Sequence, residues 1–173
     1  MDGNSLKRFI RDIPDFPKPG ILFKDITPLL RDPAALSLAI ELLSQPFINK
    51  GVNVVTGTES RGFIFAAAVA RNLAAGLVPI RKPGRLPSKV AAKEYALEYG
   101  SDKVEIHVDS INRGDRVLLI DDLLATGGTI EACLHLVESL GAEVVGAAFL
   151  IELDALAGRN RLNGVMVHSV LRY

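Results

Sequence analysis

The sequence of 173 residues is poor in cysteine, lacks tryptophan and has no excess of charge of either sign. Cys133 is its single cysteine, so no internal disulfide can form, and this usage fits a reducing, cytoplasmic location. The 20 basic residues balance the 20 acidic ones, which leaves a formal net charge of zero. Because general nucleic-acid binding depends on an excess of positive charge, we expect no nucleic-acid partner.

Long hydrophobic runs and metal-ligand clusters are missing as well. The longest apolar runs, residues 63–70 and 144–151, are far shorter than the roughly 20 residues that span a bilayer, and the N-terminus is polar. We therefore expect no membrane partner. The histidines His107, His135 and His168 are scattered and, with one cysteine, match no usual metal-ligand spacing, so we expect no structural zinc.

The composition and the hydrophobic pattern are those of one globular domain over residues 1–173. Hydrophobic residues make up 49% of the chain and charged residues 23%, which excludes a disordered chain. Strands and helices are predicted to alternate along the chain: continuous apolar, β-branched runs predict strands at residues 52–56, 77–80, 116–120, 144–150 and 165–169, and helices are predicted at 62–73 and 129–140. The fold class is therefore α/β, a doubly wound, mainly parallel sheet flanked by helices, with ligands at the carboxyl ends of the strands.

Other segments carry local signals of their own. A helical spacing of apolar residues predicts a short amphipathic helix that ends before Pro14; these residues are Leu6, Phe9, Ile10 and Ile13. Residues 14–20 contain three prolines and a glycine, which predict an extended loop. Asp32 as N-cap and Pro33 at the first helical position predict a further helix. Residues 82–95 show neither the periodicity of a helix nor that of a strand, and we expect a long loop there.

The most informative motif follows the strand predicted at residues 116–120. Two adjacent carboxylates, Asp121 and Asp122, come directly after that strand, and a glycine-rich turn then leads into a helix. The turn consists of Ala125, Thr126, Gly127, Gly128 and Thr129. Glycines let backbone N–H groups surround an anion, and a helix N-terminus adds partial positive charge, so the turn is a candidate phosphate cradle. The carboxylates would hold vicinal sugar hydroxyls, and a phosphorylated ribose matches both features.

A plainer interpretation of the motif is a tight turn with two acids that cap the helix. Other phosphate-binding motifs are not indicated, because neither G-x-x-x-x-G-K-[ST] nor G-x-G-x-x-G occurs in the sequence. A P-loop NTPase and a Rossmann dehydrogenase are therefore set aside.

A basic stretch without acids precedes the motif. Between Ser60 and Lys93 the chain contains only basic charges, at Arg61, Arg71, Arg81, Lys82, Arg85, Lys89 and Lys93. Arg71 lies in the middle of a predicted helix, where a solvated surface side chain is the usual outcome. Arg61 and the group from Arg81 to Arg85 follow predicted strands, where they would meet an anionic ligand.

Residues 117–129, VLLIDDLLATGGT, resemble the phosphoribosyl pyrophosphate signature of the type I phosphoribosyltransferases. Further segments are similar to the adenine-specific members of that family, in the same order: FPKPGILFKDI at residues 16–26, ESRGF at 59–63, IRKPG at 80–84 and LEYG at 97–100. The resemblance covers essentially the whole chain. It implies the type I phosphoribosyltransferase fold, with a small N-terminal base-binding hood.

The resemblance also implies a reaction. It is the Mg²⁺-dependent transfer of the 5-phosphoribosyl group from 5-phosphoribosyl 1-pyrophosphate to adenine, giving AMP and pyrophosphate in purine salvage. The implied cofactor is Mg²⁺, held mainly by substrate and water with no direct protein ligand, as this ion often is. The implied assembly is a homodimer.

The same resemblance assigns roles to individual residues. The implied catalytic residues are Glu98, Arg61, Asp121 and Asp122, with Glu98 as general acid or base on the purine. Pyrophosphate binding is implied for Glu59, Ser60, Arg61, Arg81, Lys82 and Arg85, in a loop that in this family often contains a cis peptide bond not preceding proline. The 5-phosphate is assigned to the glycine-rich turn, residues 125–129.

Adenine binding is implied for Leu22, Phe23 and Lys24, within a hood that comprises residues 1–32. The Phe23 ring can stack on the base, while the backbone groups of its two neighbours can pair with the base edge. The alternative for Phe23 is ordinary core packing. Residues 82–98 are the implied flexible catalytic loop, which would exclude water from the reaction.

Some positions depart from the family pattern, and other functions remain open on the sequence. Lys24 stands where many members have arginine, Arg85 where many have lysine, and Thr58 replaces a common apolar residue. These substitutions alter hydrogen-bond geometry but do not change the enzyme class that the resemblance implies. One alternative is a transferase for another base, such as xanthine. Another is a regulatory protein that keeps the signature but binds DNA, although 173 residues leave no room for an added DNA-binding module.

Overall fold

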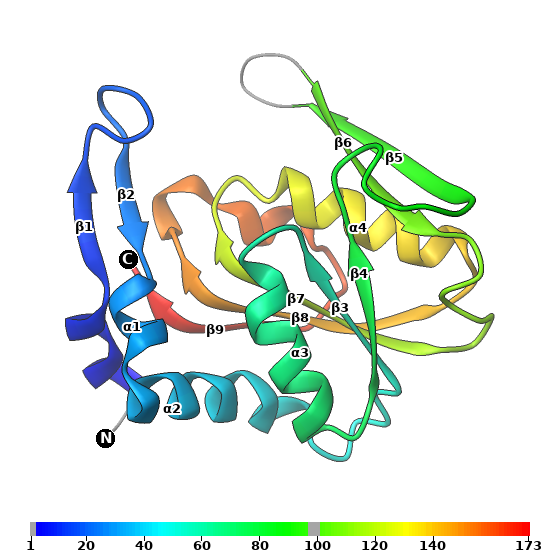
Figure 1. The fold of residues 1–173 in the computed structure, drawn as a ribbon, viewed down its shortest axis with the longest axis horizontal. Helices are drawn as coiled ribbons and strands as arrows, with labels where there is room; N and C mark the ends of the chain where they lie inside the picture. Colours follow the sequence, from blue (N-terminus) through cyan, green and yellow to red (C-terminus); the bar gives the residue numbers. More distant parts are fainter. Residues whose placement is uncertain (1–2, 97–100) are drawn as a thin grey trace.

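The structure, a computed structural model, describes residues 3–96 and 101–173. Its centre is a five-stranded sheet in the order β4-β3-β7-β8-β9, in which every strand pair is parallel (Figure 1). The strands are β3 (Val54–Thr58), β4 (Gly76–Ile80), β7 (Arg116–Leu124), β8 (Glu143–Glu152) and β9 (Val167–Arg172). The predicted parallel α/β class is confirmed, with strand ends that differ from the predicted ones by a few residues.

Helices cover both faces of this sheet. Helices α2 (Pro33–Ser44) and α3 (Gly62–Asn72) pack on one face, and α4 (Gly128–Ser139) packs on the other. Because neighbouring residues of a strand point to opposite faces, Leu118 and Ile120 of β7 lie in the core with α2 and α3, whereas Leu119 lies in the core with α4. The sheet is therefore buried on both sides, as its continuous apolar strands predicted.

The predicted start of α2 is confirmed. The Asp32 carboxylate accepts hydrogen bonds from the backbone N–H groups of Ala34 and Ala35, at 3.0 and 2.9 Å. Pro33 occupies the first turn, where its missing N–H costs nothing. An additional short helix, α1 (Thr27–Arg31), precedes it and was not predicted.

The hood, of which the structure describes residues 3–32, contains a small hairpin beside the sheet. It contains a 3-10 helix, η1 (Gly3–Phe9), followed by strands β1 (Arg11–Pro14) and β2 (Leu22–Asp25), which pair antiparallel. The predicted helix through Ile13 is wrong, because Ile13 pairs with Phe23 in the β1–β2 hairpin. Pairing between the two strands of this hairpin overrides the helical spacing of the apolar residues.

A second hairpin lies where part of the loop was expected at residues 82–98, and that part of the prediction is wrong. Residues 90–96 form β5 (Val90–Ala96), which pairs antiparallel with β6 (Ser101–His107). Tyr95, Val104 and Ile106 from this hairpin are buried in the core that includes α4. The β5 sequence is rich in alanine and gave no strand signal of its own, since the pairing partner supplies the stabilisation.

The hood and the β5–β6 hairpin stand on either side of the sheet edge where β3 and β7 end (Figure 1). The described residues contain three further short 3-10 helices, η2 (Gln45–Phe47), η3 (Asp154–Leu156) and η4 (Gly158–Arg161). Among the described residues, no helix combines the length and the apolar character that a membrane crossing requires.

Candidate functional site

The acidic pair lies at the carboxyl end of the central strand β7. The strand predicted at residues 116–120 extends to Leu124, because Asp121 pairs with Phe149 and Leu123 pairs with Ile151. Asp121 and Asp122 are therefore strand residues whose side chains point to opposite faces of the sheet. Asp121 lines a small cavity with the glycine-rich turn, whereas Asp122 faces Arg61.

Arg61 connects the acidic pair to the hood. Its Nη2 atom lies 2.9 Å from Oδ2 of Asp122, whose side chain is only 7% exposed. The Arg61 guanidinium also lies over the ring of Phe23, 5.0 Å from the ring centroid, and Phe23 meets Phe16 edge-on at 5.1 Å. One cation thus bridges a buried carboxylate and an aromatic face, an arrangement favourable on both sides.

Burial shifts the ionisation of both acids. Burial raises the pKa of Asp121 well above its ordinary value, and the neighbouring charge of Asp122 raises it further. Burial also raises the pKa of Asp122, while the Arg61 cation opposes that shift. The pair therefore holds a proton to a higher pH than isolated aspartates do, and Arg61 is the group that favours its ionised form.

The glycine-rich turn leads from β7 into α4. Gly127 has a φ of +83°, a backbone conformation that side chains other than glycine rarely adopt, and α4 begins at Gly128. The turn and Asp121 enclose a cavity of about 80 Å³. The first residues of this twelve-residue helix line the cavity, and a helix N-terminus in that position suits an anion such as phosphate.

The loop after β3 is organised by Glu59. Its carboxylate accepts hydrogen bonds from Nη2 and Nε of Arg81, at 3.0 and 3.2 Å, and from the backbone N–H of Lys82 at 3.0 Å. The Arg81 hydrogen bonds are the main reason why the pKa of Glu59 lies below its ordinary value. The Glu59–Ser60 peptide bond is cis, as the family resemblance indicated.

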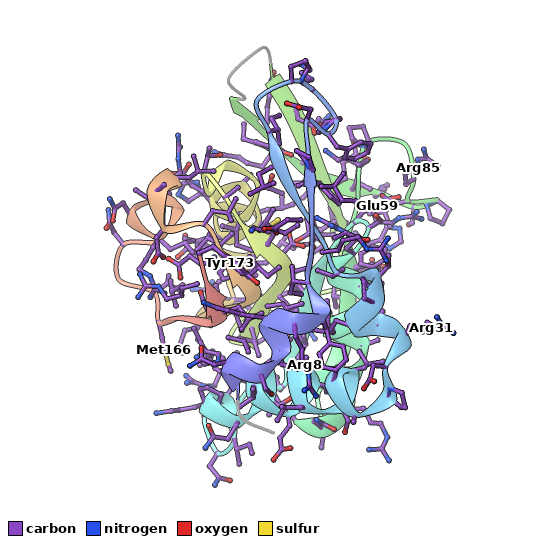
Figure 2. The ribbon with its side chains drawn as sticks, turned by 90° about the vertical axis from the view of Figure 1, so that its left-hand side faces the viewer. Arg8, Arg31, Glu59, Arg85, Met166 and Tyr173 are labelled. Atoms are coloured by element: carbon purple, nitrogen blue, oxygen red, sulfur yellow. The ribbon has the colours of Figure 1, made fainter. Side chains whose placement is uncertain are left out.

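The other basic residues differ in their surroundings. Lys82 contacts the Asp102 carboxylate and lies 3.5 Å from the Tyr95 hydroxyl, so the β5–β6 hairpin reaches it. Arg85 is exposed, and Figure 2 shows it at the outer margin of the molecule beyond Glu59. Its backbone carbonyl accepts a hydrogen bond from Nη1 of Arg81 at 3.0 Å.

The segment expected to hold adenine is strand β2 of the hood. Leu22 is exposed and Phe23 is half-buried, whereas the Lys24 ammonium turns away to Asp12, 2.6 Å distant, and lies over the Tyr173 ring. Only the backbone of Lys24 is thus available to a base. Because this hairpin has two strands, one edge of β2 has no strand partner in the described part of the chain. That edge can pair with a planar heterocycle.

The structure brings together most of the predicted residues. The acidic pair, Arg61, Phe23 and the glycine-rich turn share one edge of the sheet, and Glu59 with Arg81 flanks them. Glu98 lies outside the described residues. The sequence carries no signal for Tyr95 and Asp102, because only the β5–β6 pairing brings them to Lys82. Within residues 3–96 and 101–173, no group of three or more His, Cys, Asp or Glu residues could hold a metal ion.

Known proteins resemble this chain closely. The family described as phosphoribosyl transferase domain matches residues 26–169. Adenine phosphoribosyltransferase of Methylococcus capsulatus is 60% identical over 170 residues, which cover 98% of this chain and 99% of that protein. The crystal structure of adenine phosphoribosyltransferase from Rhodothermus marinus has a TM-score of 0.95 at 55% identity and covers 99% of this chain and 98% of that one.

A third solved structure carries ligands. Adenine phosphoribosyltransferase from Saccharomyces cerevisiae, complexed with an imino-altritol bisphosphate and adenine, has a TM-score of 0.92 at 38% identity. The match covers 97% of each chain, so the whole fold is shared rather than one motif.

Proposed function

From the membership of this chain in the phosphoribosyl transferase family, among the adenine phosphoribosyltransferases, we propose an Mg²⁺-dependent reaction at the site described above. The reaction transfers the 5-phosphoribosyl group to adenine: a bond from adenine to C1 of the ribose replaces the bond from C1 to pyrophosphate. The products are AMP and pyrophosphate, and the reaction serves purine salvage in the cytoplasm. The observation that carries the proposal is that the acidic pair of β7 is followed directly by the glycine-rich start of α4, while Arg61 contacts both Asp122 and Phe23.

The sugar phosphate is held at two places. The backbone N–H groups of the glycine-rich turn, with the hydroxyls of Thr126 and Thr129, receive the 5-phosphate, which takes no part in bond breaking. Asp121 and Asp122 accept hydrogen bonds from the ribose hydroxyls. These two contacts fix the sugar with its C1 atom toward the hood.

Adenine binds between the hood and the sheet edge. The Phe23 ring stacks on its face, and the backbone groups of Leu22 and Lys24 pair with its edge. Glu98 moves the proton on the imidazole nitrogens as general acid or base. The prolines at residues 14–19 stiffen this segment and reduce the entropy lost on binding.

The departing pyrophosphate leaves positive charge on C1 and the ring oxygen of the ribose, as in glycoside chemistry. The ionised acidic pair lies near that developing charge and stabilises it. Arg61, Ser60 and the basic group at Arg81, Lys82 and Arg85 receive the leaving anion. Arg61 thus serves both ends of the breaking bond, since it also keeps Asp122 ionised.

The donor set fits Mg²⁺ that takes most of its oxygen ligands from substrate and water. Oδ2 of Asp122 is buried with the Arg61 guanidinium as its ion-pair partner, and both carboxylates offer the hard oxygen atoms that this ion prefers. Asp121 and Asp122 would hold its water ligands. When bound, Mg²⁺ would neutralise charge on the pyrophosphate leaving group.

A direct assay tests this proposal. Purified protein with 5-phosphoribosyl 1-pyrophosphate and Mg²⁺ should convert adenine to AMP, and hypoxanthine, guanine and xanthine should compete poorly because their edges present different donors and acceptors to β2. Chelation of Mg²⁺ should abolish turnover. Preferred use of xanthine would support the other-base alternative, and absence of all turnover would contradict the proposal.

Glu59→Gln should raise KM for 5-phosphoribosyl 1-pyrophosphate by about tenfold, with a smaller effect on KM for adenine. The carboxylate aligns Arg81 and Lys82 for the anion, and charge-assisted hydrogen bonds of about 1.5–3 kcal/mol hold that alignment. Steady-state kinetics with each substrate varied in turn measures the effect. An unchanged KM would show that Glu59 does not organise this loop.

The proposed homodimer has support in the apolar surface of the molecule. Phe16, Ile21, Leu22 and Ile64 are each more than 40% exposed, and all lie on the hood or the start of α3. Phe16 and Ile64 line the same surface hollow, and exposed apolar side chains of this kind are typical of a subunit interface. Sedimentation equilibrium that showed only monomer would contradict the proposal.

A further inference from the structure

The backbone at Gly158 lies directly against the glycine-rich turn. A Cβ atom built on Gly158 would lie 2.2 Å from the carbonyl oxygen of Ala125 and 2.9 Å from the nitrogen of Gly127. A Cβ atom on Gly127 would in turn lie 2.5 Å from the carbonyl oxygen of Gly158. Both distances under 2.6 Å involve backbone atoms, which cannot swing aside as a flexible side chain can. The two segments therefore touch with no room for a side chain between them.

The two glycines are needed for different reasons. Gly127 has a positive φ, so both its conformation and the available space require glycine. Gly158 has no positive φ, and its conformation is open to other residues. Only the close approach to the turn explains a glycine at position 158.

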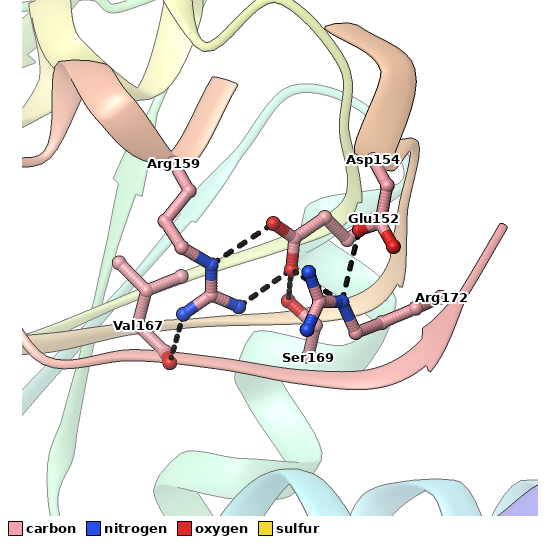
Figure 3. A network of polar contacts seen from close by, with 6 residues as sticks. All are labelled: Glu152, Asp154, Arg159, Val167, Ser169 and Arg172. Atoms are coloured by element: carbon pink, nitrogen blue, oxygen red, sulfur yellow. Dashed lines mark hydrogen bonds and ion pairs between the residues drawn. The ribbon is translucent and has the colours of Figure 1, made fainter. Parts of the chain in front are cut away.

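A buried carboxylate anchors the segment that carries Gly158. Glu152, at the end of β8 and 3% exposed, accepts hydrogen bonds from Nε and Nη2 of Arg159 at 3.0 and 2.6 Å (Figure 3). The hydroxyl of Ser169 in β9 donates to the same carboxylate at 2.6 Å, and Nη1 of Arg159 donates to the carbonyl oxygen of Val167 at 2.9 Å. The residue next to Gly158 is thus fixed to two strands of the sheet.

The Glu152 carboxylate is ionised, and its backbone adjoins the start of the glycine-rich turn. Hydrogen bonds from Arg159 lower the pKa of Glu152, although burial opposes that shift. Glu152 pairs in the sheet with Leu124, the last residue of β7 before the turn, and the N–H of Leu153 donates to the Leu124 carbonyl at 2.9 Å. Glu152 and the glycine-rich turn are therefore adjacent at the carboxyl ends of β8 and β7.

We infer that Gly158 and the Glu152–Arg159 ion pair are positioning residues for the 5-phosphate, an inference that rests on the function proposed for the turn. Arg159 holds Gly158 against the backbone of Ala125 and Gly127, and this contact fixes the direction of the N–H groups that receive the phosphate. None of these three residues needs to touch the substrate. Displacement of the turn by a fraction of an ångström weakens every phosphate contact together.

The test compares Gly158→Ala with Gly76→Ala. Gly76 is an exposed glycine at the start of β4 whose added Cβ atom would meet only one atom, at an ordinary 3.7 Å. Gly158→Ala should weaken calorimetric binding of ribose 5-phosphate by about tenfold to a hundredfold, the scale of a misplaced binding group. KM for 5-phosphoribosyl 1-pyrophosphate should rise in parallel, whereas KM for adenine should stay within twofold or so of the wild-type value. Gly76→Ala should change none of these quantities.

Further variants separate the possible outcomes. Gly127→Val alters the turn itself, so normal ribose 5-phosphate binding by that variant would overturn the proposed function of the turn. If Gly127→Val loses binding while Gly158→Ala binds normally, the positioning inference alone is overturned. Equal losses for adenine and ribose 5-phosphate in Gly158→Ala would indicate general damage to the fold and would also overturn it.

Arg159→Lys provides a second test of the inference in case Gly158→Ala does not fold. Lysine retains the charge but has a single nitrogen, so it cannot reproduce the two-nitrogen contact of Arg159 with Glu152 and its separate donor to Val167. This variant should weaken ribose 5-phosphate binding several-fold without altering KM for adenine, and wild-type binding of ribose 5-phosphate by folded Arg159→Lys would overturn the inference.

Discussion

Replacing Arg61 with alanine should lower kcat/KM by about a hundredfold to a thousandfold, the scale seen when one electrostatic donor to a transition state is removed. The variant loses a cation that lies 2.9 Å from the buried Asp122 carboxylate and covers the Phe23 ring. It also loses the contact proposed for the departing pyrophosphate. Most of the loss should appear in kcat, because the leaving anion gains charge only as the bond breaks.

Arg61→Ala should also move the acidic limb of the pH–rate profile to higher pH. Burial raises the pKa of Asp122, and the Arg61 cation opposes that shift. Without the cation, the pKa of Asp122 rises further, so a larger fraction of the acidic pair is protonated at a given pH. Since the ionised pair is proposed to stabilise the positive ribose, the variant should recover part of its activity as the pH is raised.

Steady-state kinetics across pH with two comparison variants measures both effects. Arg71→Ala removes an exposed arginine from the same helix and should behave as wild type. Asp122→Asn removes the titrating group, so the double variant Arg61→Ala/Asp122→Asn should lose less than the sum of the single losses. Wild-type turnover by Arg61→Ala, or an acidic limb that does not move, would contradict this account of Arg61.

The parts of the fold that the sequence predicted are those with a strong local signal. Strands β7 and β8 are continuous apolar runs, and the start of α2 combines Asp32 with Pro33. The strand ends were missed where polar residues continue a strand through pairing alone, as Asp121 does opposite Phe149. The β1–β2 and β5–β6 hairpins were missed for the same reason, since pairing between segments overrode weak or opposing local patterns.

Within the site, too, the features set by local sequence were predictable and those set by contacts between separate segments were not. The glycine-rich turn was predictable because its backbone conformation is a local property, visible in Gly127 and the helix that follows. The partners of Arg61 and Glu59 were not, because Asp122 and Arg81 lie far along the chain and meet them only in the folded sheet. Gly158 gave no signal at all, since a glycine kept for space alone looks like any other loop glycine.

Gly127→Val should abolish measurable binding of the sugar phosphate while the fold survives. The new side chain would have to adopt a φ of +83°, and its Cβ atom would lie 2.5 Å from the carbonyl oxygen of Gly158. The turn must then move away from Gly158, and the N–H groups of the turn no longer converge on one point. Loss of two hydrogen bonds to a charged group, about 1.5–3 kcal/mol each, corresponds to about a hundredfold or more in affinity.

Calorimetric binding of ribose 5-phosphate, with thermal unfolding of each variant, separates this effect from backbone strain. Gly114→Val is the matched control, because Gly114 has a φ of +88° but no atom lies within 4 Å of its added Cβ. Both variants should unfold at lower temperature, since both force a β-branched residue into a strained conformation, but only Gly127→Val should lose ribose 5-phosphate. Asp122→Asn should show the opposite pattern, near-normal binding with a reduced chemical step, because its charge acts on the positive ribose that forms later. If Gly127→Val bound ribose 5-phosphate as tightly as Gly114→Val does, the 5-phosphate would have to bind elsewhere on the sheet edge.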